Sequence, residues 1–443
     1  MDVIENKRKI DESIDGNRDA ILAIAQRLGE HPELGYKENF ATEHIAGLLK
    51  ELGFDPTTGI AVTGVQADSA GASSGPTVVI MGELDAVIAP EHPDADPETG
   101  AAHACGHNIQ VAAMMGAVIG LVKAGVLEKL DGNLRIVAVP AEEFVELGYR
   151  AELKAAGKIS FFGGKQELIK RGLFDDVDTA MMIHALDLGA QKQKLLVAPT
   201  GNGFIGKNVH YKGVPSHAGS APEKGVNALN AAMLGMMNIH ALRETFPDKE
   251  RIRVHPMLTK GGDMVNIVPA DVRMESYVRA ASVEWMQKVN EKISRALLAG
   301  AMAVGAEVEI QDIPGYLPLL DTPDLDEIFI ANALGAVEEA EIQRGAQFSG
   351  SFDIGDVSHI LPVLHPLIGG VAGDLHTSQF RITDPDTAVL LPAKIMAKSI
   401  VDLLADGAAG LRQVKSGFTP TMTKEQYLTF MDTIDRTIVG PQG

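Results

Sequence analysis

Cysteine is almost absent from this sequence. Cys105 is the one cysteine among 443 residues, so no disulfide bond can form within the chain. This cysteine usage is typical of a reducing compartment, and we expect a cytoplasmic location. The segment from Met1 to Asp15 is charged throughout and has no apolar signal-peptide core.

Long hydrophobic runs and an excess of basic residues are also lacking. The longest apolar run, Val111 to Val122, is shorter than the roughly 18 residues that predict a membrane span. The 39 Lys and Arg are outnumbered by 59 Asp and Glu, which gives a net charge of −20. Nucleic acids and anionic membrane surfaces attract clustered basic residues, so we expect neither as a partner.

The rest of the composition is that of a globular protein, with 45% hydrophobic and 22% charged residues. Apolar strands are expected at 77–81, 134–139 and 179–183, and a buried helix is expected at 109–124. Strands that alternate with helices and are apolar nearly throughout predict an α/β fold with a buried, mostly parallel sheet.

A different pattern fills the middle of the chain. The expected order is a strand at 208–212, a helix at 225–244, a strand at 252–258, one or two strands within 266–279, a helix at 282–304 and a strand at 307–313. This β-α-β-β-α-β order is that of a ferredoxin-like α+β unit. We therefore expect a domain at 199–313 inserted into an α/β domain with parts at 1–198 and 314–416. A polar tail at 417–443 follows, and the sequence leaves its order open.

The segment from His103 to Asn108 (HACGHN) is the strongest chemical motif. Cys105 and His107 stand two residues apart before a helix, whose N-terminus favours a thiolate. Thiolate and imidazole are good ligands for zinc-like ions. A buried cysteine beside loop histidines is an equally good reading of these residues alone.

Acidic residues and a histidine follow the three expected strands. Glu142 and Glu143 come after the second strand, and adjacent side chains on extended backbone point in opposite directions. One could therefore bind a metal while the other acts as general base, and a solvated loop entrance is the alternative for this pair taken alone. Asp85 follows the first strand and could orient a ligand histidine, and His184 ends the third.

The carboxyl ends of parallel strands meet at one edge of a sheet, so we expect these side chains to converge there. His376, in a late loop, adds another donor. Together, these candidate ligands outnumber those that one tetrahedral ion accepts. Two ions about 3.5–4 Å apart would therefore fit better. In the inserted domain, His217 and Asn266 could stabilise an oxyanion and Arg279 could clamp a carboxylate, although each could instead be structural.

Taken together, these motifs resemble those of the di-metal amidohydrolases. This family contains aminoacylases, auxin-conjugate hydrolases, hippurate hydrolases and p-aminobenzoyl-glutamate hydrolases. The resemblance extends from His31 to about Leu404 and is carried by HPELGYKE, GELDA, HACGHN, VPAEE, GGKQELIKRGLFDDVD, IHA, GVPSHAGSAPEKGVNAL, NIVPADVRMESYVRA, SFDIGDVSHILP and DLHTSQF. GELDA, SFDIGDVSHILP and Asn108, where the family commonly has Asp, are most similar to the branch that contains the p-aminobenzoyl-glutamate hydrolase B-subunit.

The resemblance implies a role for each of these residues. Cys105 is implied as the bridging ligand, Glu142 as the general base and acid, and Asp85 as the orienting acid. The other implied metal ligands are His107, Glu143, His184 and His376. Asn266 and Arg279 are implied as substrate contacts, and His217 as a residue that reaches an active site, often that of a partner subunit. The inserted domain is implied as a lid and dimerisation domain, and the α/β domain as catalytic.

The expected activity is metal-dependent hydrolysis of an amide in an N-acyl amino acid, N-aroyl amino acid or dipeptide-like substrate that carries a carboxylate. The expected cofactors are two divalent ions, zinc or manganese, with cobalt or nickel as alternatives. A homodimer through the inserted domain is expected, and a hetero-oligomer stays open. Residues 144–162 form a longer connection than the family's and are expected to shape the pocket.

Three other activities stay open. An aromatic or heterocyclic aminohydrolase would release ammonia with the same metal site. A cysteine-nucleophile amidase would use Cys105 with His107 as base. A non-catalytic binding protein would have no need of Glu142 or of a complete ligand set.

Overall fold

The computed structural model describes residues 1–69, 75–189 and 193–440, and these form two units. The first contains 1–200, 320–347 and 356–423, and the second contains 201–319, 348–355 and 424–443. Each unit is described by itself. Among the described residues, none of the helices combines the length and apolar character that crossing a membrane requires.

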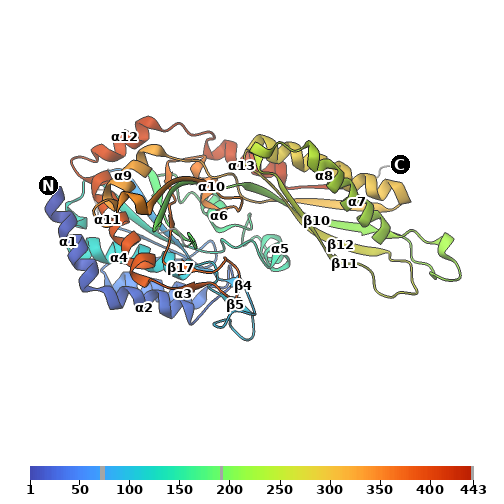
Figure 1. Ribbon diagram of the computed structural model, residues 1–443, viewed down its shortest axis with the longest axis horizontal. Helices are drawn as coiled ribbons and strands as arrows, with labels where there is room; N and C mark the ends of the chain where they lie inside the picture. The colour runs from blue at the N-terminus through green and yellow to red at the C-terminus, as the bar shows by residue number, and fades with distance from the viewer. Residues whose placement is uncertain (70–74, 190–192, 441–443) are drawn as a thin grey trace. The chain divides into compact units, whose positions relative to one another are not determined.

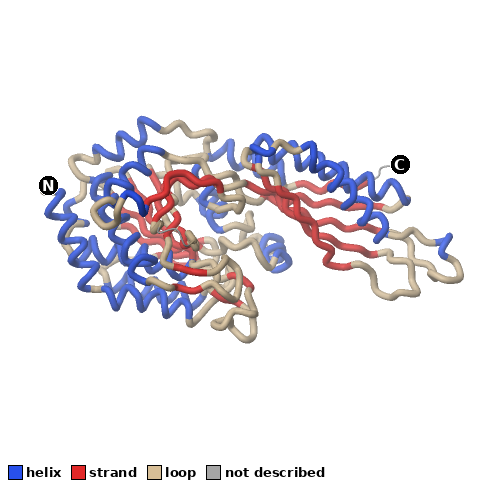
Figure 2. Tube along the Cα trace, in the orientation of Figure 1, coloured by secondary structure: helices blue, strands red, loops and turns tan. Residues whose placement is uncertain are grey.

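The first unit is built on a six-stranded sheet (Figures 1 and 2). Its order is β1 (Thr57–Ile60), β2 (Gly64–Asp68), β6 (Asn133–Val139), β3 (Thr77–Glu83), β7 (Thr179–Met181) and β15 (Val363–Leu364). The neighbours from β6 to β15 are parallel, whereas β1 and β2 form an antiparallel edge. The apolar run of β3 is buried at every position, as the sequence predicts for a covered parallel strand.

Smaller sheets complete this unit. One is a four-stranded sheet with the order β14 (Ile342–Gln347), β9 (Leu195–Thr200), β16 (Leu367–Ile368) and β8 (His184–Ala185). A two-stranded sheet pairs β4 (Val87–Ile88) with β5 (Ala101–Ala102), and another pairs β17 (Val371–Ala372) with β18 (Arg381–Ile382). The helices are α1 (Val3–Gly16), α2 (Arg18–Gly29), α3 (Asn39–Glu51), α4 (His107–Lys123), α5 (Leu147–Ala155), α6 (Gly164–Arg171), α9 (Pro323–Ala333), α11 (Leu391–Leu404) and α12 (Ala409–Gly417). Helix α10 (Ile354–Ser358) lies where the chain passes from one unit to the other.

Helix α4 is the centre of the first unit's core. It is apolar on all sides, and every residue from His107 to Leu121 is buried. It packs against α1, α2, α11 and the central strand β3 (Figure 1). The core therefore fixes the start of α4, which carries the Cys105 and His107 motif, relative to the end of β3.

The second unit is a five-stranded antiparallel sheet with two long helices on one face (Figure 1). The strand order is β11 (Arg253–Lys260), β12 (Asp271–Ala280), β10 (Gly203–Lys212), β13 (Glu307–Pro314) and β19 (Arg436–Gly440), and the helices are α7 (Ala228–Leu242) and α8 (Val283–Val304). The chain order from β10 to β13 is the predicted β-α-β-β-α-β order. Only one strand, β12, lies within the region where one or two were expected.

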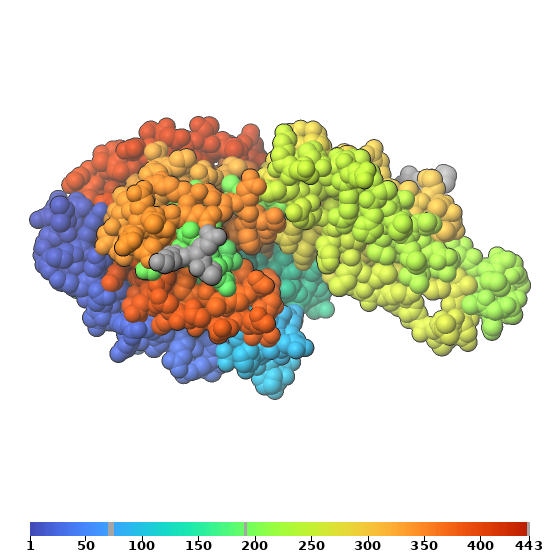
Figure 3. Space-filling model, viewed as in Figure 1, coloured from blue at the N-terminus to red at the C-terminus, as the bar shows by residue number. Residues whose placement is uncertain are grey.

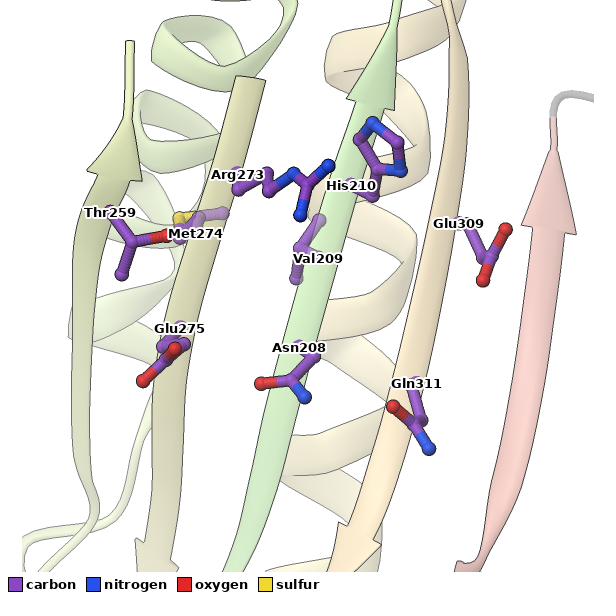
Figure 4. Close-up of a pocket in the computed structure, with 9 residues that line it drawn as sticks. All are labelled: Asn208, Val209, His210, Thr259, Arg273, Met274, Glu275, Glu309 and Gln311. Atoms are coloured by element: carbon purple, nitrogen blue, oxygen red, sulfur yellow. The ribbon is translucent and has the colours of Figure 1, made fainter. Parts of the chain in front are cut away.

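The helix-free face of this sheet is polar. Figure 4 shows the side chains that line a shallow hollow of about 280 Å³ on it, among them Asn208, Arg273 and Glu275. The alternation of buried and accessible residues along β12 explains this surface, because one side of the strand faces the helices and the other faces outward.

The unit boundaries differ from those expected. Residues 348–355 were placed in the α/β domain, and 417–443 were described as a polar tail. In the structure, 348–355 belong to the second unit, where Asn202 N donates to Gly350 O at 2.8 Å. Residues 424–434 form helix α13 (Lys424–Ile434), and β19 pairs with β13. The polar sequence of this C-terminal segment did not predict a strand, because the strand pairs with a partner far away in the chain.

Candidate metal centre

Parallel strands bring the predicted acidic residues to one edge of the first unit's sheet. Strands β3 and β6 end level, because Glu83 is paired with Val139 in the ladder. Asp85 follows the first of these strands, and Glu142 and Glu143 follow the second. All four acidic side chains are buried. Their position follows from the strand register, and strand ends that meet at one sheet edge were predicted from the sequence.

A glycine shapes the turn that carries the cysteine and histidine motif. Gly106 caps the start of α4 with a φ of 81°, a left-handed conformation that glycine adopts without strain. A Cβ at this position would lie 3.0 Å from Ala185 Cβ and 3.2 Å from a ring atom of Phe380. The turn can therefore present Cys105 and His107 only because residue 106 has no side chain.

The predicted ligand atoms gather in three groups. Within each group the atoms lie within 4.8 Å of one another: Cys105, His107 and His184; Cys105, Glu143 and His376; and Glu83, His107 and Glu142. Cys105 belongs to the first two, with its Sγ 3.4 Å from His184 Nε2 and 3.3 Å from His376 Nε2. These two groups could hold two ions that share one thiolate.

The donor set fits a pair of divalent ions. Nε2 of His107 and Oε1 of Glu143 are both buried atoms. Each faces another donor, since His107 Nε2 lies 3.1 Å from Glu83 Oε2 and Glu143 Oε1 lies 3.0 Å from His376 Nε2. Buried donors that converge in this way, with sulfur, nitrogen and oxygen atoms together, are suited to ions such as zinc.

Asp85 contacts both sides of this arrangement. His107 Nδ1 lies 2.8 Å from the Asp85 carbonyl oxygen and 3.2 Å from its Oδ1. Glu143 N donates to Asp85 Oδ2 at 2.8 Å. A proton on Nδ1 of His107 is fixed by these acceptors, so the free lone pair of His107 is on Nε2, toward the ligand groups.

The thiol of Cys105 behaves differently from the sequence expectation. The helix N-terminus was expected to favour a thiolate, but burial and then the charge of Glu143 raise the pKa of the Cys105 thiol well above its usual value. Burial and the nearby carboxylates outweigh the effect of the helix N-terminus on this thiol, because Cys105 is buried and lies beside Glu143. A bound divalent ion would deprotonate the thiol outright.

The histidine and carboxylate ligands have shifted pKa values that suit metal binding. Burial, followed by the charge of His107, lowers the pKa of His184 to about 4 and leaves its imidazole neutral. Burial acts to raise the pKa of Glu143, but its hydrogen bond with His376 and the charge of that residue outweigh this and lower it to about 2. Neutral imidazole and ionised carboxylate are the forms that bind metals.

The three site residues predicted in the inserted domain lie in the second unit. His217 pairs with Ile267 in an isolated bridge, and its Nδ1 accepts hydrogen bonds from Gly219 N and Ser220 N at 3.1 Å each. Its Nε2 therefore carries the proton. Asn266 O accepts from Ala218 N at 2.9 Å, which places Asn266 beside the same turn.

Arg279 lies at the end of β12 in that unit. Its guanidinium donates to Ser351 Oγ at 2.6 Å and lies over the rings of Phe204 and Tyr277, at 5.1 and 5.4 Å from their centroids. These contacts hold the planar guanidinium in one orientation.

The long segment 144–162 is tied to the first unit by a buried arginine. Arg150, in α5, is 0% exposed and donates to Phe162 O at 2.6 Å and to Glu143 O. Its guanidinium also lies 5.4 Å from the ring of Tyr36. The segment is thus a built element that holds the backbone of Glu143.

Asn108, which departs from the common family pattern, lies outside the three ligand groups. Its Nδ2 donates to Ala25 O at 3.0 Å. It therefore joins α4 to α2 and contacts none of the predicted ligands through that bond.

Sequence reasoning missed two buried residues at the site. Lys165 Nζ lies 2.5 Å from Glu83 Oε1, and the His365 ring lies 6.2 Å from that of His184. Burial, and then the charge of His184, lowers the pKa of His365 to about 3. The position of Lys165 directly after Gly163 and Gly164 could have marked it as a site residue. Its burial, however, depends on the fold and could not be predicted from the sequence.

Comparisons with known proteins find relatives of this chain among named hydrolases and peptidases. Residues 201–302 match the family model described as Peptidase dimerisation domain. The chain is 28% identical to Xaa-Arg dipeptidase from Mus musculus, over 95% of this chain and 94% of that protein. It is 25% identical to the p-aminobenzoyl-glutamate hydrolase B-subunit of Escherichia coli K12, over 92% of this chain and 93% of that protein.

The fold is also found in solved structures. A dinuclear metal-binding peptidase of the M20 family from Bacillus subtilis matches with a TM-score of 0.65 and 20% identity, over 88% of this chain and 99% of that one. The expected α/β fold with an inserted domain is confirmed by this match and by the domain at 201–302. The chain is thus a hydrolase related to the M20 peptidases and amidohydrolases, with a peptidase dimerisation domain in its second unit.

Proposed function

We propose that this protein hydrolyses the amide bond of a dipeptide or of an N-acyl or N-aroyl amino acid, in a reaction that depends on two divalent metal ions. The observation that carries the proposal is the pair of ligand groups that share Cys105, with Glu142 beside them. Cys105, His107, Glu143, His184 and His376 would hold the ions. When bound, two such ions supply a polarised carbonyl and a water of lowered pKa.

Glu142 is the proposed general base. Its carboxylate is largely buried, lies 3.9 Å from His107 Nε2 and faces the ligand groups without belonging to the two that share Cys105. It would take the proton of the attacking water and deliver it to the leaving amine. Asp85 would hold His107 and the Glu143 backbone in place during these transfers.

Residues of the second unit are proposed to bind the substrate. His217 carries its proton on Nε2 and, with Asn266, would donate to the oxyanion. Arg279 would hold the carboxylate of the amino-acid portion, because a guanidinium matches a carboxylate with two hydrogen bonds. Zinc is the metal that sulfur and nitrogen ligands favour, with manganese, cobalt or nickel as alternatives.

A homodimer through the second unit is part of this proposal. Met233 and Met237 of α7 are 52% and 64% exposed, and β11 is an edge strand of the sheet formed by the described residues. In the space-filling view, the yellow-green part of this unit, which includes α7, lies at the surface that faces the viewer (Figure 3). Exposed apolar residues and an open strand edge are features that a partner chain covers. We also propose a cytoplasmic location, as the single cysteine suggests.

The function is tested by a mass-spectrometric turnover screen on metal-reconstituted protein, with a chelated sample as control. The panel holds Xaa-Arg dipeptides and p-aminobenzoyl-glutamate, for which relatives are named, together with N-acyl amino acids and amino-aromatics. Chelator-sensitive cleavage of an amide is the expected result. Release of ammonia without cleavage of an amide would contradict the proposal and would favour an aromatic or heterocyclic aminohydrolase.

A further inference from the structure

We propose that Glu38 is a positioning residue for Glu142: its buried carboxyl holds the loop that follows β6 in the conformation that directs Glu142 toward the ligand groups. This role rests on the proposed function, in which Glu142 moves the proton. Glu38 itself belongs to none of the three ligand groups, so it would act only through the loop.

The loop has an unusual backbone at Ala141. Its φ of 53° lies in the left-handed region, which residues with a side chain rarely adopt. Ala141 directly precedes Glu142, so its conformation sets the direction in which the chain presents the Glu142 carboxylate. A conformation of this kind persists only where the surrounding structure holds it. The placing of Glu142 therefore depends on the contacts of Ala141.

Glu38 supplies one of these contacts. Its side chain is 0% exposed, and Oε1 accepts from Ala141 N at 2.7 Å. Oε2 accepts from Thr63 Oγ1, so both oxygens of the carboxyl are engaged. The carbonyl oxygen of Ala141 accepts from Gly164 N at 3.1 Å. Both backbone polar groups of Ala141 are thus bound, and Glu38 binds the one that lies farther from Glu142 along the chain.

Glu38 does not fill the role that its place in the chain would give it. It is the N-cap residue of α3, where a side-chain oxygen usually accepts from the first turn, but it makes no such hydrogen bond. Phe40 N and Ala41 N instead donate to the two carboxylate oxygens of Glu33, at 3.0 Å each. Because Glu33 caps the helix, the carboxyl of Glu38 is available for Ala141.

The segment that carries this carboxyl also packs against the loop. A Cβ on Gly35 would lie 2.9 Å from both Cα and Cβ of Ala141, so only glycine allows this close approach. On the far side of Glu142, Glu143 N donates to Asp85 Oδ2 at 2.8 Å. The backbone is therefore fixed both before and after Glu142, as the placing of a proton acceptor requires.

The first test compares kcat, KM and metal content of the metal-reconstituted full chain for the wild type, Glu38→Met and Glu38→Gln. The substrate is the panel member that the turnover screen shows to be cleaved. Glu38→Met removes the acceptor for Ala141 N, and we expect kcat to fall about 10- to 100-fold while KM and metal content stay unchanged. Glu38→Gln keeps an acceptor oxygen and is expected to restore most of kcat. An unchanged kcat in Glu38→Met would overturn the inference.

A double variant separates positioning from a merely structural role. In the Glu142→Gln background, Glu38→Met is expected to cause no further loss of residual turnover, because the residue through which it acts is already inactive. Thr63→Val is the matched control, since it removes the other partner of the same carboxyl and leaves the bond to Ala141; its kcat should stay near that of the wild type. A full further loss in the double variant, or an equal loss in Thr63→Val, would overturn the positioning role.

A shorter acid keeps the inference testable if Glu38→Met does not fold. Glu38→Asp retains a residue that is favoured at an N-cap, but its carboxyl is one methylene farther from Ala141 N. We expect backbone hydrogen exchange in the peptide that contains 140–143 to be faster than in the wild type, measured by mass spectrometry. Unchanged exchange would overturn the inference whatever the activity. A wild type that cleaves no amide, with this loop still protected through Glu38, would contradict the proposed function alone.

Discussion

Glu142 and Glu143 are neighbours in the chain but meet different partners. Glu143 lies 3.0 Å from His376, whereas Glu142 lies 3.9 Å from His107. Ala141, just before them, has a φ of 53°, and strained backbone of this kind clusters at functional sites. The two carboxylates therefore lie in separate environments, and their roles as general base and metal ligand remain a proposal.

Glu142→Gln is expected to lower kcat by about 10²- to 10⁴-fold and to leave the metal content unchanged, because it removes a proton acceptor and no ligand. Turnover and metal analysis by mass spectrometry check this. Glu143→Gln and Cys105→Ser are the matched variants, and both should lose metal. Full activity of Glu142→Gln would remove Glu142 from the mechanism.

Glu38 gives the protein a pH dependence that can be assigned to one residue. Its carboxyl accepts from Ala141 N at 2.7 Å and from Thr63 Oγ1, and burial followed by the charge of Asp85 raises its pKa from 4.5 to about 7. The folded protein thus keeps a proton that the unfolded chain has lost. The stabilisation is complete below pH 4.5 and is lost as the pH rises through 7.

We expect Glu38→Gln, which mimics the protonated acid, to remove this loss. Between pH 4.5 and 8 the wild type should lose about 3 kcal/mol of unfolding free energy more than the variant. Urea unfolding of chelated protein at several pH values measures the difference. Parallel pH profiles for the two proteins would show that Glu38 does not titrate in this range.

At the residue scale, the sequence predicted donors that follow apolar strands. Such candidate ligands can be predicted because the ends of parallel strands meet at one edge of the sheet, however the side chains pack. Lys165 and His365 could not be predicted as site residues. The local sequence does not distinguish a buried lysine or histidine from one at the surface. The raised pKa of Cys105 was also missed, since it depends first on burial and then on the charge of Glu143, which follows another strand.

The segment 144–162 contains helix α5, which is anchored by the buried Arg150. Arg150→Met removes two hydrogen bonds from a charged donor to the backbone at Phe162 and Glu143, and should destabilise the protein by about 2–5 kcal/mol. Urea unfolding measures the loss, with Glu152→Gln on the exposed side of the same helix as control. Equal stability of the two variants would show that Arg150 does not anchor the segment.

At the scale of elements, long periodic patterns were predicted well and short strands poorly. The helix expected at 225–244 is α7 at 228–242, and that expected at 282–304 is α8 at 283–304. Strand β19 was missed, because it has only five residues and follows a polar segment. Its pairing with β13 joins positions more than 100 residues apart, a contact that local sequence does not encode.

For the whole molecule, the proposed dimer makes a direct prediction. Met237→Glu places a charge on the exposed apolar face of α7 and is expected to shift the protein from dimer to monomer in light scattering after size exclusion. Ile4→Glu, at a residue 84% exposed in the first unit, is the control and should stay dimeric. An unchanged dimer of Met237→Glu would place the interface elsewhere.

The insertion of one domain into another could be predicted because the two have different element orders. The exact division could not. The hydrogen bond from Asn202 to Gly350 and the ladder between β13 and β19 draw late segments into the second unit, and both depend on tertiary contacts.

Strand β19 also has a consequence for how the protein is made. Translation delivers β13 long before the strand that covers it, so the growing chain displays an open strand edge while more than 100 further residues are synthesised. Open edges of this kind recruit strands from other chains. The period between these two strands is therefore the interval in which nascent chains are most exposed to aggregation and to chaperone binding, and slowing translation there would lengthen it.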